Sequence, residues 1–305
     1  RFGSLQFGGG VGSATGFFGF LKLEFMNVLG EWYNLSVQGQ WGEKQMTYQL
    51  KYVNPWFFPD HTSLAARLWN TDGQVDDGQG IKAFSTGGEL TMGKVLSREI
   101  KGSTTVRMNN VIPQDASGNY QSSSSYQVRS LGGGLSYDTR DFYFNPSVGD
   151  YIAINANSSL KLLGASIEFL KYQIRWNKYF PLMENVARGL KGTFDDSLGT
   201  IFDAERYYIG GATTIRGYRD GSPIGIGGRR YLGSVEVRYN ISTAMQLYIF
   251  YDFGKISQGY ADCNFYGDTN WRSGKGIGFK ISTPLGPLRF DYAWGDGATY
   301  NSGLD

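Results

Sequence analysis

Side chains that could carry covalent chemistry are scarce in this chain of 305 residues. It has one cysteine, Cys263, and one histidine, His61. A single cysteine cannot form an internal disulfide, and no cluster of His, Cys, Asp or Glu has the spacing of a zinc site. The residues around His61 do not have a pattern that would suggest a catalytic triad. We therefore expect no catalytic residue, no bound metal, no cofactor and no enzymatic activity.

Two other patterns in the sequence could mark a ligand site. Residues 225–228, Gly-Ile-Gly-Gly, are rich in glycine, but a phosphate-binding loop needs a helix after it and none is predicted here. The acidic pairs Asp76-Asp77 and Asp195-Asp196 are interpreted as solvated turns. The net charge of +2 is too small to indicate a nucleic-acid partner. None of these patterns predicts a bound ligand.

Arg216 is the residue best placed for a specific non-covalent contact. It lies in a connection of about 35 residues, between predicted strands that end near 194 and begin near 229, and connections this long are usually functional or disordered. The connection is too apolar for a loop in water, because it contains Tyr207, Tyr208, Ile209, Ile215 and Tyr218. We expect it to fold back into a wide barrel and to bury these side chains against the inner wall.

Inside a barrel Arg216 would need an acidic partner, because a buried guanidinium without one is costly. Glu236 and Asp252 lie on the predicted inward faces of the next two strands. An arginine can bind a carboxylate through two parallel hydrogen bonds. We predict that Arg216 pairs with Asp252, Glu236 or both, and so holds the loop in the lumen. The alternative is an ordinary solvated arginine in a turn.

The strands that would position these groups are visible as a period of two. The clearest segment has Met245, Leu247, Ile249, Tyr251 and Phe253 on one face and Gln246, Tyr248, Phe250, Asp252 and Gly254 on the other. Similar alternation, with charged and amide side chains on one face, recurs in 33–41, 45–52, 103–109, 170–177 and 230–239. The 44 glycines and the 16% of aromatic residues also favour β structure.

Alternation alone fits either a soluble β-sandwich or a membrane barrel. In a sandwich the apolar face packs on a second sheet, whereas in a membrane barrel it meets lipid and the polar face lines the lumen. The segments run for about 9 to 14 residues, which suits a membrane crossing and exceeds the soluble average of about 5–6. Aromatic residues gather at segment ends, as in 56–58 and 176–180, like interfacial girdles. The sequence therefore predicts an all-β fold, a transmembrane antiparallel β-barrel.

We predict one barrel domain covering residues 1–305 and fifteen strands: 3–12, 15–26, 31–42, 45–55, 61–71, 80–93, 99–110, 123–137, 148–158, 165–179, 185–194, 229–240, 244–254, 271–283 and 286–295. Bacterial single-chain barrels have an even number of strands. Because the tail 295–305 has the composition of a loop, we expect a sixteenth strand to be missing. The first five residues lack the basic and apolar regions of a signal peptide, so we expect the natural chain to start earlier.

The loop motif Ile215-Arg216-Gly217-Tyr218 resembles the [V/I]-R-G-[F/Y] signature of the outer-membrane protein insertase superfamily, which includes BamA, TamA, the two-partner-secretion transporters and the chloroplast import pore. Further matches follow the family's order along the chain: Asn54-Pro55-Trp56-Phe57, Asp138-Thr139-Arg140-Asp141 with Pro146 and Gly149, Ser234-Val235-Glu236, Asp252-Phe253-Gly254, and the hairpin at 282–288. The ordered set is much more specific than any single motif.

The resemblance implies a sixteen-stranded barrel in the outer membrane of a Gram-negative-type envelope or a derived organelle. It also implies periplasmic POTRA domains before this chain. The implied partners are outer-membrane lipids, unfolded client proteins of the outer membrane, periplasmic chaperones and accessory lipoproteins. In this family the first and last strands close the barrel. The first strand here contains Gly8, Gly9, Gly10 and Gly12, which should pair weakly and could form a lateral gate. Alternatively, these glycines merely permit sharp curvature.

Three functions follow from the resemblance. The leading one is a BamA-like barrel that folds and inserts client barrels through a weak lateral seam, with the loop carrying Arg216 folded inside. The second is a two-partner-secretion transporter that exports a dedicated protein through the lumen. The third is the barrel of an outer-membrane patatin-like phospholipase. A plain diffusion porin is least expected, because the Arg216 loop should obstruct the pore.

Overall fold

The computed structural model describes residues 3–12, 16–30, 32–74, 81–115, 117–143, 145–220, 222–242, 244–283 and 286–296. Within these ranges the helical elements are four short 3-10 turns, at Val28–Gly30, Ser122–Ser124, Lys161–Leu163 and Asp203–Glu205. Among the described residues, no helix is long and apolar enough to cross a membrane.

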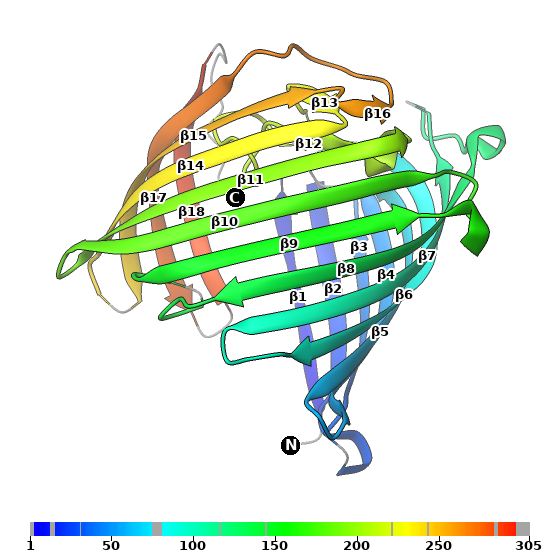
Figure 1. Cartoon of the computed structure of the whole chain (residues 1–305), viewed down its shortest axis with the longest axis horizontal. Helices are drawn as coiled ribbons and strands as arrows, with labels where there is room; N and C mark the ends of the chain where they lie inside the picture. The colour runs from blue at the N-terminus through cyan, green and yellow to red at the C-terminus, as the bar shows by residue number, and fades with distance from the viewer. Residues whose placement is uncertain are drawn as a thin grey trace.

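Fifteen strands follow one another around a single curved sheet, each antiparallel to the next (Figure 1). These are β1 (Gly3–Gly12), β2 (Gly16–Phe25), β3 (Asn34–Gly42), β4 (Gln45–Phe58), β5 (Thr62–Gln74), β6 (Lys82–Val95), β7 (Ile100–Pro113), β8 (Tyr126–Asp138), β9 (Gly149–Ser159), β10 (Phe169–Met183), β11 (Val186–Thr200), β14 (Arg229–Asn240), β15 (Met245–Ser257), β17 (Arg272–Thr283) and β18 (Gly286–Gly295). Three short strands lie in the loops: β12 (Tyr207–Ile209) pairs with β13 (Gly225–Gly227), and β16 (Tyr260–Asp262) runs parallel to β11.

The predicted all-β barrel architecture is confirmed, and each of the fifteen predicted segments overlaps one of these strands. The main difference is that several strands are longer than predicted; β11, for example, continues to Thr200 instead of ending at 194. Residues 54–57 lie in the last part of β4, where the register with β5 shifts. Of the predicted hairpin at 282–288, residues 284–285 lie outside the described ranges.

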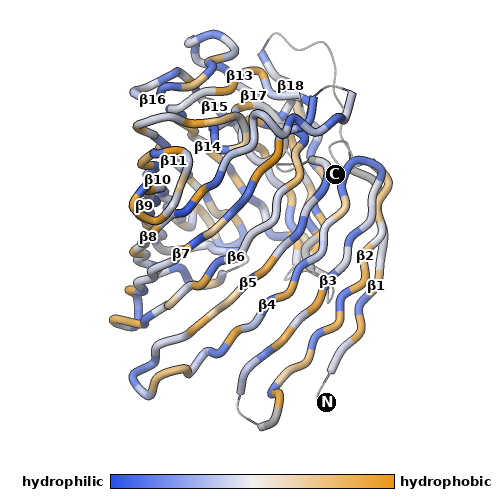
Figure 2. Tube along the Cα trace, turned by 90° about the vertical axis from the view of Figure 1, so that its right-hand side faces the viewer, coloured by the Kyte–Doolittle hydropathy of each residue, from blue (hydrophilic) through white to orange (hydrophobic). Residues whose placement is uncertain are grey.

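The two faces of the sheet have opposite chemistry, and β15 shows this most clearly. Its side chains alternate strictly between exposed and buried from Met245 to Asp252. Ile249 is 58% exposed on the outer face, whereas its neighbour Phe250 is 5% exposed on the inner face. Figure 2 shows the alternation of apolar and polar residues along neighbouring strands. A sandwich would cover the apolar face with a second sheet, so this exposed apolar face indicates contact with lipid.

The sheet begins with β1 and ends with β18. Figure 1 shows β17 and β18 on the same rear side as β1 and β2, so the sheet curls around an interior. Because consecutive strands are antiparallel, the turns after β8, β14 and β17 lie at the end of the barrel where β1 starts. The long connection between β11 and β14 lies at the opposite end.

Candidate functional site

The connection between β11 and β14, called here the Arg216 loop (residues 201–228), folds into the interior of the barrel. Its two short strands, β12 and β13, contact the inner side of β14 and β15. Ile209 and Ile215 pack against Ile256 of β15, and all three are at most 1% exposed. Tyr207 and Tyr218 border this cluster. The apolar side chains of the loop therefore lie against the inner wall, which is where the sequence reasoning placed them.

Arg216 lies against two inward carboxylates and is 5% exposed. Its Nε is 2.5 Å from Oδ2 of Asp252, and its Nη2 is 2.7 Å from Oδ1 of the same side chain. The same Nη2 is 3.1 Å from Oε1 of Glu236, so the structure brings Arg216 to both predicted partners. The guanidinium also lies 3.4 Å from the ring centroid of Phe250. Two parallel hydrogen bonds and an aromatic face fix its position and orientation.

Both carboxylates have further partners, so the cluster is a network. Glu236 accepts hydrogen bonds from Arg238 at 2.6 and 3.0 Å and from Lys191 at 3.1 Å. Asp252 accepts one from Ser234 at 2.7 Å. Burial opposes the charge of Arg216, but its hydrogen bonds to Asp252 prevail and raise its pKa. Arg216 is therefore charged at any physiological pH, and its removal would leave two buried carboxylates short of a cation.

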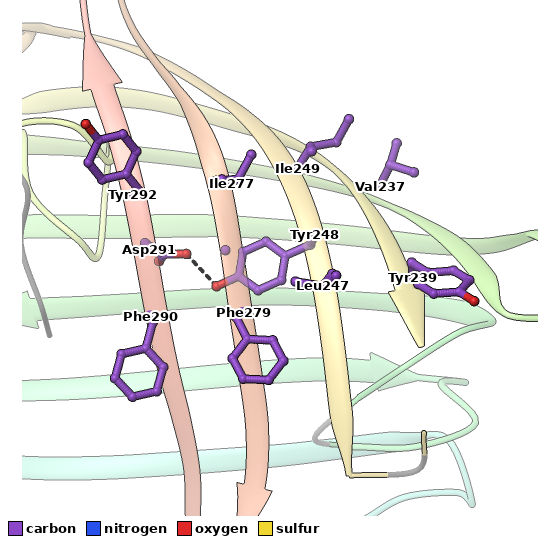
Figure 3. Close-up of a pocket in the computed structure, with 11 residues that line it drawn as sticks. Val237, Tyr239, Leu247, Tyr248, Ile249, Ile277, Phe279, Phe290, Asp291 and Tyr292 are labelled. Atoms are coloured by element: carbon purple, nitrogen blue, oxygen red, sulfur yellow. Dashed lines mark hydrogen bonds between the residues drawn. The ribbon is translucent and has the colours of Figure 1, made fainter. Parts of the chain in front are cut away.

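Glycines on the inner face of β17 make room for this loop. Gly274, Gly276 and Gly278 follow one another on the inward side of the strand. The ring of Phe250 lies over Gly276, 2.7 Å from where a Cβ would stand, and the carbonyl oxygen of Arg216 takes the corresponding space at Gly274. The Tyr248 ring lies over Gly278. Its hydroxyl donates a hydrogen bond to Asp291 of β18, as Figure 3 shows. This role was not among the predictions, although the Gly-x-Gly-x-Gly spacing is visible in the sequence.

The tip of the loop touches β18, a contact that the sequence analysis did not anticipate. Gly217 has φ +98°, and a Cβ there would lie 2.5 Å from the backbone nitrogen of Gly295. The Tyr218 ring covers Gly295, and its hydroxyl donates to the Asp296 carboxylate. The carbonyl oxygens of Ser273 and Asp296 lie 3.2 and 3.0 Å from the same hydroxyl. Burial, and then the hydrogen bond to the Asp296 carboxylate, raise the pKa of the Tyr218 hydroxyl. The four motif residues thus connect the loop to the wall from β14 to β18.

The glycines of the predicted seam all lie in β1, where they pair with β2. A Cβ at Gly8 would stand 2.8 Å from the Phe20 ring, and one at Gly10 would stand 3.2 Å from the Phe18 ring. Gly9 faces the Phe18 carbonyl oxygen, and Gly12 is opposite Gly16. At two of the four positions the glycines therefore seat aromatic rings of the neighbouring strand, which is a packing role that neither sequence interpretation included.

The interpretation of Asp195-Asp196 as a solvated turn is wrong. Both residues lie in β11 and are 0% exposed. Asp195 pairs with Arg230 at 2.8 Å, and Asp196 pairs with Arg229 at 2.7 Å. The Arg216 loop covers one face of this part of β11, where Arg230 also contacts the Tyr208 carbonyl, and β16 covers its edge. Asp76-Asp77 lies outside the described residues.

The turn between β8 and β9 reaches toward the same network from the opposite end of the barrel. Arg140 donates to both carboxylate oxygens of Asp138, at 2.8 and 2.7 Å, as an ion pair between the first and third residues of the motif Asp138-Thr139-Arg140-Asp141. The Pro146 carbonyl accepts a hydrogen bond from Arg238 at 3.4 Å. Gly149, with φ +107°, lies against the Thr139 carbonyl. The motif at 138–149 therefore folds under the inner wall.

The residues first considered for catalysis lie apart from this network. His61 lies in the turn between β4 and β5, with its ring 5.0 Å from that of Trp56. Cys263 follows β16 and packs at the border of an apolar cluster that includes Ile201. Residues 225–227 form β13, and β14 begins at Arg229, so a strand rather than a helix follows the glycines. In the described part of the chain no group of His, Cys, Asp and Glu has the arrangement of a metal site.

Comparison with known proteins agrees with this architecture. The Omp85 superfamily domain matches residues 27–302. Outer envelope protein 80 from the chloroplasts of Arabidopsis thaliana is 25% identical over 96% of this chain and 44% of its own length. The outer membrane protein assembly factor BamA of Nitratidesulfovibrio vulgaris is 28% identical over 52% of this chain and 22% of its own length. The chain thus spans less than half the length of the curated relatives it matches.

Solved structures share the fold. BamA of Haemophilus ducreyi lacking POTRA domains 1–3 superposes with a TM-score of 0.78 at 18% identity, over 99% of this chain and 68% of that one. CdiB of Escherichia coli superposes with a TM-score of 0.69 at 17% identity, over 96% of this chain and 58% of that one. The matched domain begins after β2 and covers the strands from β3 to β18 together with the Arg216 loop. This chain therefore belongs to the Omp85 superfamily and is one of its outer-membrane β-barrels.

Proposed function

We propose that this barrel folds and inserts other β-barrel proteins of the outer membrane through a weak seam at β1. The observation that carries the proposal is the backbone edge of β1. Among the described residues β1 pairs with β2 alone, so the N–H and C=O groups of its other edge have no strand partner there. In lipid such groups require a partner, and the strand of an incoming protein can supply one by β-augmentation.

The composition of β1 supports a pairing that can be exchanged. Gly8, Gly9, Gly10 and Gly12 lose more conformational entropy on pairing than other residues and contribute no side-chain packing of their own. An edge that binds weakly can pair with a client strand and release it later. No covalent step is needed, because the template supplies only hydrogen-bonding groups.

The Arg216 loop would hold the opposite end of the sheet in place. Its contacts extend from Glu236 and Asp252 on β14 and β15 to Ser273 on β17 and Gly295 on β18. With these four strands fixed, opening would be concentrated at β1. In this proposal Arg216, Glu236 and Asp252 are positioning residues, and the motif Ile215-Arg216-Gly217-Tyr218 acts as an anchor.

The partners belong to the same proposal. They are outer-membrane lipids around the apolar outer face, unfolded client barrels at the seam, and the periplasmic chaperones and accessory lipoproteins that deliver and assist them. POTRA domains preceding residue 1 would receive the clients. The relatives named assembly factor and outer envelope protein support this reading.

The competing function is secretion of a dedicated protein through the lumen, for which the likeness of fold to CdiB is the supporting observation. Such a transporter has to clear the Arg216 loop from the path. The buried ion pairs of Arg216 oppose that movement, because separating them leaves uncompensated charge in the barrel. We therefore favour insertion.

Site-specific photo-crosslinking tests the choice in cells that depend on the full-length protein. A photoreactive amino acid replaces Phe7, which is 79% exposed on β1, in one variant. In a second variant it replaces Leu135, which is 55% exposed on the outer face of β8. In a third it replaces Asn155, which lies on the inner face of β9.

Insertion predicts adducts with newly made outer-membrane barrels at Phe7 and none at Leu135 or Asn155. Secretion predicts an adduct with one exported protein at Asn155. Adducts that are equally frequent at Phe7 and Leu135 would contradict a seam at β1.

A further inference from the structure

The Arg216 loop contacts a second wall of the barrel with its first residues, called here the entry segment (residues 201–206). Ile201 belongs to one buried apolar cluster with Val111 of β7 and Phe169 of β10. The tip of the same loop, in contrast, contacts β14 and β15 through Arg216 and β18 through Gly217. The two parts of the loop therefore pack against different groups of strands.

These two groups of strands face each other across the lumen. Seven strands separate β7 from β18 in the order of the sheet, which places them on opposite sides of the barrel. Figure 1 shows β7 at the right of the barrel and β17 and β18 at the left. Ile201, Glu205 and Ile209, which are spaced along the path from one side to the other, are all buried. The loop therefore spans the lumen, and neighbouring atoms enclose it along this path.

Glu205 connects the entry segment to the strands of the second wall. It ends the short 3-10 turn at Asp203–Glu205. Nζ of Lys171, on β10, is 3.3 Å from its Oε2 and donates to its carbonyl oxygen at 2.6 Å. Nη2 of Arg107, on β7, is 3.7 Å from its Oε1. Each oxygen of one carboxylate thus faces a cation from a different strand, and β8 and β9 lie between those two strands.

The burial of this cluster makes its ion pairs hard to break. The Glu205 side chain is 7% exposed and that of Lys171 is 19% exposed. The ring centroid of Tyr207 lies 4.8 Å from Nζ of Lys171, so an aromatic face covers the cation beside its two hydrogen bonds. Removing one partner of a buried ion pair leaves an uncompensated charge, which is strongly destabilising. The entry segment is therefore held at its charged residue as firmly as the tip is held at Arg216.

We propose that Glu205 is a positioning residue, a second anchor that fixes the entry segment to β7 and β10 separately from the anchor at Arg216. With both anchors in place the loop stays across the lumen and closes it to a polypeptide. The use of this closed lumen during client insertion rests on the function proposed above, whereas the anchoring and the closure do not.

Hydrogen exchange of the detergent-solubilised full-length protein can follow the two parts of the loop separately. The amide of Ile201 donates to the carbonyl oxygen of Asp262 at 3.0 Å and reports on the entry segment. The amide of Gly211 donates to the carbonyl oxygen of Ile215 at 3.1 Å and reports on the tip. The test variant is Glu205→Gln, which keeps the shape of the side chain and removes its charge.

We expect Glu205→Gln to exchange the Ile201 amide at least about tenfold faster than the wild type, and the Gly211 amide within about twofold of it. The control is Glu168→Gln, because Glu168 is half-exposed and pairs with Lys161 on the outside of the lumen, where an ion pair contributes little. It should leave both amides as in the wild type. Unchanged exchange at Ile201, or equal acceleration at both amides, overturns a separate second anchor.

A double-mutant cycle separates an ion-pair anchor from a packing defect at position 205. Lys171→Gln removes the partner, so its effect on the Ile201 amide should not add to that of Glu205→Gln. The double variant should therefore exchange this amide no faster than the faster of the two single variants. Effects that multiply in the double variant would show that the two side chains act independently and would contradict the anchor.

Conductance across a planar bilayer tests the closure with the same purified protein. Glu205→Gln should give a higher mean conductance than the wild type, because a released entry segment opens a path along β7 and β10. Glu168→Gln should conduct as the wild type does. Equal conductance of the wild type and Glu205→Gln would contradict a lumen that this anchor keeps closed.

Discussion

At one end of the sheet, the Arg216 loop holds four strands together through buried ion pairs, close backbone contacts and an aromatic hydroxyl. At the other end, β1 pairs with β2, and phenylalanine rings of β2 pack over glycines of β1. Asp252 and Glu236 are at most 3% exposed at the first end, whereas Phe7 is 79% exposed at the second. Separating a buried ion pair costs much free energy, whereas separating an exposed, glycine-rich strand from its neighbour costs little. One barrel can therefore combine a fixed wall with an exchangeable edge.

The largest expected effect comes from removing the anchor. Arg216→Ala leaves Asp252 and Glu236 buried without their shared cation, and breaking a buried ion pair in this way costs about 3–5 kcal/mol. We expect the loop to leave the wall and become sensitive to protease, and client assembly to fail in cells that depend on the protein. Limited proteolysis and a complementation assay measure the two effects.

Arg219→Ala is the matched control for that change. Arg219 lies in the same loop but is exposed, so its removal should leave both readouts as in the wild type. If the loop of the Arg216→Ala variant resists protease as well as that of Arg219→Ala, the fixed wall does not depend on the ion pairs.

The close approach of the loop to β18 can be tested at Gly217. Gly217→Ala adds a Cβ at φ +98°, 2.5 Å from the backbone nitrogen of Gly295, and should cost about 1–3 kcal/mol through strain and displacement of the strand. Gly30→Ala is its control, because Gly30 has φ +84° with open space around it. Both variants pay for the left-handed backbone, so a lower Tm for Gly217→Ala than for Gly30→Ala measures the contact. Equal Tm values would show that the contact with β18 contributes nothing.

The smallest effect on stability is expected at the exchangeable edge. A Cβ at Gly10 would stand 3.2 Å from the Phe18 ring, which can move because β1 lies at the edge of the sheet. Gly10→Ala should therefore change the free energy of unfolding by less than about 1 kcal/mol while slowing hydrogen exchange along β1. Gly192→Ala, where a Cβ would meet ring and backbone atoms of Trp176 no closer than 3.8 Å, is an interior control that should leave exchange in β1 unchanged. Faster exchange in β1 of Gly10→Ala would contradict the assignment of its weakness to glycine.

The alternation of apolar and polar residues within each segment was enough to predict the barrel strands. The contact of Arg216 with acidic residues could be predicted because a buried guanidinium needs a carboxylate partner. The alternation along β15 specifies an outer and an inner face without reference to any other strand. Arg216 in an apolar loop required buried acids, and Glu236 and Asp252 lie on the inner faces of the next two strands.

What could not be predicted depends on contacts between distant segments. The burial of Asp195 and Asp196 could not be predicted, because only the fold brings Arg229, Arg230 and β16 to them. The role of the glycines at 274, 276 and 278 depends on the register of β15 with β17, which places Asp252, Phe250 and Tyr248 directly opposite them. That register cannot be derived from the residue pattern of each strand taken alone.

Hydrogen exchange of the full-length protein, in wild type and Arg216→Ala, tests the contrast between the two ends most directly. The wild type should exchange backbone hydrogens along β1 much faster than along β17 and β18, and Arg216→Ala should accelerate β17 and β18 toward the rate of β1 while leaving β1 itself unchanged. Equal protection of β1 and β18 in the wild type, or unchanged protection of β17 and β18 in Arg216→Ala, would contradict a wall fixed by the loop.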